Sequence, residues 1–138
     1  MRNYYFQFLL VCTSITLLSY CSISVGKQIS RIVVYKVAKG KERFIGVTEV
    51  NIKLNSTAEI IEIKDSLCLE EIKKRIESLK KLKGTHAMRS IYMLCDITYK
   101  DGSIQTISFE EANLGVIKMG NKIYSNSPSL ESWLLFCK

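Results

Sequence analysis

Residues 65–84 read DSLCLEEIKKRIESLKKLKG, and this stretch decides the fold because it has the periodicity of one long amphipathic helix. Its apolar side chains recur at steps of three and four, which places them on a single helix face: Leu69, Ile72, Ile76, Leu79 and Leu82. Asp65 or Ser66 can cap the first turn, and Gly84 can supply a left-handed stop. A helix of this length is marginal alone, so the pattern predicts that its apolar stripe packs on neighbouring strands.

Three strand-like segments precede this helix. Residues 31–37 (RIVVYKV) form a β-branched run, and residues 57–63 (TAEIIEI) form another. Between them, residues 44–54 alternate, with Val50, Ile52 and Leu54 on the side that we expect to face the core. The first half of the domain is therefore predicted to be three strands.

A hairpin follows the helix. Residues 89–99 read as a strand, and Asp101-Gly102 is the strongest turn signal in the chain. A two-residue loop would place Cys95 opposite Ser108. A three-residue loop, with Gly102 left-handed, places Met93 opposite Phe109, Cys95 opposite Ile107 and Tyr99 opposite Ser103. The second register pairs apolar with apolar side chains, so we predict that one.

The chain closes with a short hairpin and a helix. Residues 115–119 and 122–125 are expected to pair around Gly120-Asn121, and Ser127-Pro128 is typical of a helix start. The predicted order is β-β-β-α-β-β-β-β-α. It indicates an α+β fold with a mainly antiparallel sheet of about five to seven strands. The central amphipathic helix and the short C-terminal helix would pack on one face, in a single domain over residues 28–138.

Residues 1–24 have the composition of a membrane-targeting leader. Arg2 is followed by no charged residue until Lys27, and residues 6–18 are strongly apolar, as in a signal peptide cleaved after Ser24. Residues 18–21 (LSYC) resemble a lipobox, in which Cys21 would be lipidated, although Tyr20 departs from that pattern. A retained membrane span and a buried core helix also fit this composition. We expect the protein to be exported, either to the cell envelope as a lipid-anchored or periplasmic protein or as a secreted one.

The cysteines of the domain are odd in number. Cys68, Cys95 and Cys137 follow the leader, and their spacing matches no zinc or redox motif, so no metal or cofactor is expected. Export permits disulfides, and Cys68 with Cys137 is the favoured bridge. Cys95 lies among apolar strand residues and is expected to be a small core side chain.

The net charge of +7 comes from 20 basic and 13 acidic residues. An exported basic domain suits an anionic lipid, a polysaccharide or an acidic protein, and no nucleic-acid-binding motif is present. The densest basic run lies in the predicted helix. Its glutamates precede Lys74, Arg75 and Lys81 by four residues, the favourable order for helix ion pairs, so a self-paired, solvated face is expected there.

The sequence favours a binding domain over an enzyme. His86 is the only histidine, so a small hydrolase with a Cys or Ser nucleophile would depend on it. Our first hypothesis is instead an extracytoplasmic, non-enzymatic interaction domain that contacts an unknown protein or envelope component. A third hypothesis is a peripheral binder of anionic membrane or glycan through the basic helix. The contact surface is predicted on the free sheet face, at Tyr92, Asp96, Thr98 and Lys100.

Overall fold

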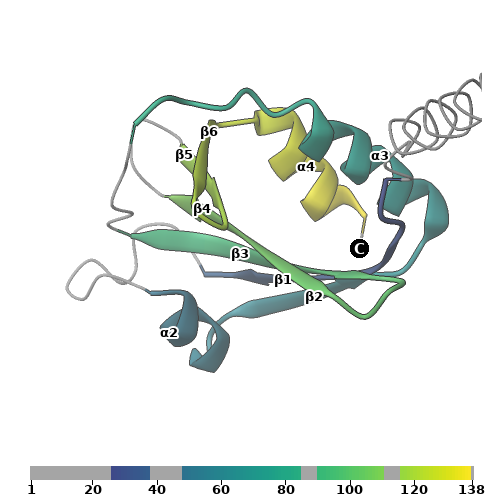
Figure 1. Cartoon of the computed structure of the whole chain (residues 1–138). Helices are drawn as coiled ribbons and strands as arrows, with labels where there is room; N and C mark the ends of the chain where they lie inside the picture. The colour runs from purple at the N-terminus through teal and green to yellow at the C-terminus, as the bar shows by residue number, and fades with distance from the viewer. Residues whose placement is uncertain (1–25, 38–47, 85–89, 111–115, 138) are drawn as a thin grey trace, which may run out of the picture.

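The computed structural model describes residues 26–37, 48–84, 90–110 and 116–137 (Figure 1). In chain order the elements are β1 (Ile29–Lys36), α2 (Glu49–Leu54), β2 (Glu59–Ile63), α3 (Ser66–Glu77), β3 (Ile91–Tyr99), β4 (Ile104–Glu110), β5 (Val116–Met119), β6 (Lys122–Ser125) and α4 (Pro128–Phe136). The strands form one open antiparallel sheet in the order β2-β1-β3-β4-β5-β6. The predicted α+β class is therefore confirmed.

The register of the β3–β4 hairpin is the one that apolar pairing predicted. Met93 lies opposite Phe109 and Cys95 opposite Ile107. The Tyr99 amide donates to the Ser103 carbonyl at 2.9 Å, and Gly102 takes a φ of +81°, as the three-residue loop requires. The hairpin thus fixes which side chains of the central strand β3 face each side of the sheet.

The central helix is shorter than its periodicity indicates. Asp65 caps it, since its Oδ1 accepts the Cys68 N–H at 2.9 Å, but the helix ends at Glu77. Residues 80–82 leave the helix and lie along β6, where the Leu82 amide donates to the Ile123 carbonyl and the Ser125 amide donates to the Lys80 carbonyl. The prediction that Gly84 ends the helix is wrong because these sheet-type hydrogen bonds replace the last helical turns.

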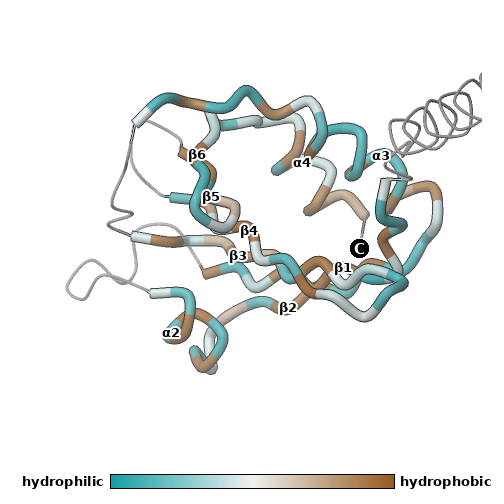
Figure 2. Tube along the Cα trace, in the orientation of Figure 1, coloured by the Kyte–Doolittle hydropathy of each residue, from teal (hydrophilic) through white to brown (hydrophobic). Residues whose placement is uncertain are grey.

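Two helices cover one face of the sheet and build the main core (Figures 1 and 2). The brown, apolar stretches of β1, β3 and β4 in Figure 2 alternate with hydrophilic ones, as expected for a sheet with a buried face. The largest fully buried side chains of this core come from the sheet and both helices: Ile32, Ile63, Ile72, Met93, Ile97, Ile107, Phe109, Ile117, Leu130 and Leu134. Burial of this surface holds α3 and α4 on the sheet.

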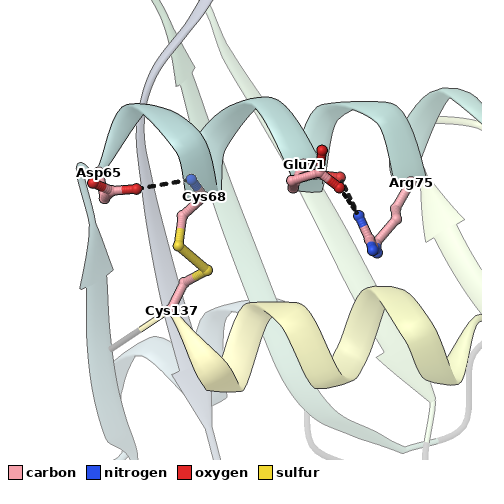
Figure 3. Close-up of a disulfide and its surroundings, with 5 residues drawn as sticks. All are labelled: Asp65, Cys68, Glu71, Arg75 and Cys137. Carbon is pink, nitrogen blue, oxygen red and sulfur yellow. Dashed lines mark hydrogen bonds and ion pairs between the residues drawn. A yellow bond between two sulfur atoms is a disulfide. The ribbon is translucent and has the colours of Figure 1, made fainter.

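A disulfide joins the two covering helices (Figure 3). Cys68 in the first turn of α3 is bonded to Cys137 at the end of α4, with 6.0 Å between their Cα atoms. This is the pair that the sequence favoured once Cys95 was assigned to the core. Farther along α3, the Arg75 guanidinium stacks on the Trp133 ring of α4 at 4.4 Å and donates to Glu71 Oε2 at 2.8 Å. Apolar packing, a covalent bond and a cation–π contact therefore all connect α3 to α4.

The predicted strand over residues 44–54 is wrong where the structure describes it, because residues 49–54 form α2. The Thr48 side chain caps this helix by accepting the Asn51 N–H. Only one of the three apolar residues expected to face the core does so: Ile52 is 0% exposed, whereas Val50 is 66% exposed. Ile52 packs in a second, smaller core with Val37, Ile91 and Leu94. Thus α2 covers part of the sheet face opposite α3 and α4.

Alanine substitutions on α2 distinguish the helix from the alternating strand. We expect Ile52→Ala to lower the free energy of unfolding by about 2–5 kcal/mol, because it opens a cavity in a closed core. Val50→Ala should change it by less than about 0.5 kcal/mol, since this side chain is exposed. Urea denaturation of both variants measures the difference, and equal losses at the two positions would support the strand instead.

Removal of the disulfide tests how strongly it holds α4. The bridge closes a loop between residues 69 positions apart, and such loops typically contribute about 2–4 kcal/mol. We expect Cys68→Ala with Cys137→Ala to lower the free energy of unfolding by that amount. The wild-type protein should lose the same amount in a reducing agent, and the double variant should be insensitive to it. An unfolding transition that reductant leaves unchanged would contradict this expectation.

Candidate functional site

The predicted contact surface on the sheet is not assembled as expected. Tyr92 is buried in the main core rather than exposed. Asp96 lies on the opposite face and is already engaged, because its carboxylate accepts the Thr106 hydroxyl at 2.7 Å and pairs with Lys53 of α2. Thr98 is half-buried, and its carbonyl accepts the Ser30 hydroxyl. Of the four candidate residues only Lys100 is exposed, so they do not share one open face of the sheet, and their role in binding stays a prediction.

Lys100 belongs to a different site, an open groove of about 550 Å³ beside the point where the chain enters the domain. The start of β1, the first turns of α3 and the β3–β4 turn form it. Its lining residues are Gln28, Ile29, Ser30, Lys64, Ser66, Leu69, Glu70, Lys73 and Lys100. We call this the proximal groove. Antiparallel pairing brings its parts together, because β1 begins where β2 and β3 end.

Positive charge dominates the proximal groove, where three lysines face one glutamate for a formal charge of +2. Lys64 pairs with Glu62 at 3.0 Å, and Lys73 lies 3.7 Å from Glu77. Among the described residues Lys100 makes no ion pair, and its backbone amide is held by the Gln28 carbonyl at 2.9 Å. The hydrogen bond fixes the backbone of Lys100 beside the groove, and its ammonium group is exposed there.

The remaining lining groups complement an anion with an apolar part. Ser66 and Gln28 bring hydrogen-bond donors to the groove, while Ile29 and Leu69 line it with apolar surface. Glu70 is the one carboxylate there, and it lies 3.4 Å from Lys74 outside the groove. Lysine ammonium groups bind phosphate, sulfate or carboxylate as point charges. The chemistry of the proximal groove is therefore that of anion binding.

Sequence reasoning misses most of this site. Lys64 precedes the helix cap, the helical pattern groups Lys73 with the other helix charges, and the strand pattern places Lys100 on the free sheet face. These three residues come from separate parts of the chain, so no spacing rule could group them. The signal available is a lysine directly beside each of two predicted boundaries, the cap at Asp65 and the turn at Asp101.

Hydrogen bonds and an ion pair to Asp101 hold the β3–β4 turn beside the groove. Asp101 accepts hydrogen bonds from the Ser103 hydroxyl and backbone amide and pairs with Lys27 at 3.0 Å. The Ser103 hydroxyl, then the Ser103 amide and Lys27, lower the pKa of Asp101 to about 2. A carboxylate with a lowered pKa contributes its full stabilisation above the ordinary value of 3.8 and loses it as the pH falls through about 2. The contribution of Asp101 to the turn is therefore constant at neutral pH and falls only in strong acid.

Loss of the Ser103 hydroxyl tests this arrangement. We expect Ser103→Ala to raise the pKa of Asp101 toward 3.8, because the largest cause of its lowering is removed. An NMR titration of the Asp101 carboxyl carbon measures the shift. Thr106→Ala is the matched control, since the Thr106 hydroxyl bonds Asp96 and not Asp101. A pKa that is the same in wild type and Ser103→Ala would show that the hydroxyl does not hold the turn.

The basic face of the helix is neutralised by its own ion pairs. Lys74 lies 3.0 Å from Glu71 and 3.4 Å from Glu70, and Arg75 bonds Glu71. Hydrogen bonds from Arg75, then Lys74, lower the pKa of Glu71. Lys81 and Lys83 lie beyond the helix and line a separate hollow with Lys122. That hollow extends to Gly84, after which residues 85–89 lie outside the described part of the chain.

Among the described residues, the groups that a hydrolase site would need are not brought together. Burial, with a smaller effect of Asp96, raises the pKa of the Cys95 thiol far above its usual range, so it is not a nucleophile. His86 lies outside the described residues. Within the described ranges, no three histidine, cysteine, aspartate or glutamate side chains gather closely enough to hold a metal.

Residues 1–25, with Cys21 and the predicted leader, also lie outside the described part. Among the helices that the structure describes, none has the length and apolar character needed to cross a membrane. Comparisons with protein-family models, with curated proteins and with solved structures find no match to this chain.

Proposed function

We propose that this protein is an exported, non-enzymatic binding domain whose contact site for an anionic partner is the proximal groove. The observation that carries the proposal is the convergence of Lys64, Lys73 and Lys100 on one open hollow. Lys100 is the member of the predicted contact set that remains exposed. In the groove it lies with two further lysines, which the sheet face does not provide.

Two further features support the proposal. The disulfide between Cys68 and Cys137 is of a kind that persists in oxidising compartments outside the cytosol, which agrees with an exporting leader. The groove also lies next to Gly26, whose carbonyl accepts the Lys73 ammonium at 3.4 Å. The contact site would therefore lie at the junction between the predicted leader and the domain.

Titration of the isotope-labelled full chain with inorganic phosphate tests the groove. We expect amide NMR shifts to concentrate at Gln28, Ser30, Ser66 and Lys100, with weak affinity that falls as salt is added, because solvated charges are screened. Lys73→Glu with Lys100→Glu should abolish these shifts.

The matched control reverses the charge of two lysines in the hollow lined by Lys81, Lys83 and Lys122. This variant, Lys81→Glu with Lys83→Glu, should leave the shifts unchanged. Shifts that gather around Lys81 and Lys122, or that survive in the Lys73/Lys100 variant, would place the anion site elsewhere. The absence of any shift would remove the proposed function.

A further inference from the structure

Three of the exposed large apolar side chains lie at the same end of the molecule as the proximal groove, outside its lining, whereas Val50, Leu54 and Ile60 are exposed on α2 and β2. Leu67 is 73% exposed, Ile104 is 65% exposed and Phe136 is 78% exposed. The groove lysines and Lys27 lie at this same end, which we call the proximal end. Its members are Lys27, Lys64, Leu67, Lys73, Lys100, Ile104 and Phe136. Large apolar groups standing in water beside clustered positive charge are a feature of surfaces that meet another phase or partner.

Three connections place these residues at one end. Leu67 precedes Cys68 and Phe136 precedes Cys137, so the disulfide brings the two apolar residues to the same end of the helical layer. Ile104 begins β4 directly after the turn that carries Lys100, on the sheet face opposite α3 and α4. The start of α3, the β3–β4 turn and the end of α4 lie together on the right of Figure 1.

From this arrangement we infer that the proximal end docks on an anionic lipid bilayer. The groove lysines hold a lipid headgroup phosphate, and Leu67, Ile104 and Phe136 enter the interface around it. The inference rests on the proposed function, because it takes the groove to be an anion site, and it adds the partner. Lysines that flank apolar side chains match the depth profile of a membrane surface, where charge meets the headgroups and apolar groups lie just below.

The position of the predicted leader favours a membrane over a soluble anion. Residues 3–26 carry no charge, and they join the domain at Gly26, which Lys73 contacts. A leader held in a bilayer, as a span or through a lipid on Cys21, leaves only a few residues before the domain. The end that faces the bilayer is then the end that bears the groove.

Fluorescence of Trp133 offers a direct test, because it is the one tryptophan of the chain and its ring centre lies 5.7 Å from that of Phe136. The full chain is reconstituted into phosphatidylcholine vesicles with brominated acyl chains, with or without phosphatidylglycerol. Only vesicles that carry the protein after flotation are compared, so a difference in quenching reports docking of the domain and not attachment. We expect strong quenching only with phosphatidylglycerol, and its loss in high salt.

Variants separate docking from simple anion binding. Lys64→Glu with Lys100→Glu should weaken docking by about 25-fold or more, because each lysine at an anionic surface contributes about fivefold. Leu67→Ser should reduce quenching but leave phosphate binding in the groove intact. Lys81→Glu with Lys83→Glu should change neither.

Equal quenching with and without phosphatidylglycerol, or quenching that persists in the Lys64/Lys100 variant, overturns the membrane inference. If either result is found and phosphate still binds the groove of the wild-type protein, the proposed function stands with a soluble anion as its partner. If phosphate binding is absent as well, both proposals fail together.

Discussion

Antiparallel pairing of β1 between β2 and β3 is the constraint on which the rest of the structure depends. It places the start of β1, the end of β2 and the end of β3 at one end of the sheet. The helix α3 leaves β2 from that end, and its apolar stripe then has only the adjacent sheet face to cover. The proximal groove exists because these same three chain segments meet, so the fold and the candidate site have one origin.

Several elements could be predicted because their signals are local. The Asp65 cap, the proline at the start of α4 and the loop of the β3–β4 hairpin each depend on a few adjacent residues. The Cys68–Cys137 bridge follows once Cys95 is placed in a strand, because only one pair then remains. In each case the local preference and the final packing agree, so tertiary structure had nothing to override.

The failures arise where a pattern fits two structures or where distant segments meet. Residues 49–54 alternate well enough for a strand, yet the same stretch also makes between one and two helical turns. Burial of Ile52 fits both structures, and only the exposure of Val50 and Leu54 distinguishes the helix. The last turns of α3 are lost because β6 offers backbone partners that the sequence does not reveal. Predicting that the groove lysines lie together would have required the strand order, which the spacing of residues along the chain does not reveal.

The two borders of the sheet are unequal, which limits how copies of this domain can associate. The β6 border is occupied by the backbone of residues 80–82, whereas no described strand pairs with the outer side of β2. Growth of a continuous sheet from molecule to molecule needs two open borders per molecule. With one open border among the described strands, association by strand addition ends at a pair of domains, so the native sheet does not extend into fibres by this route.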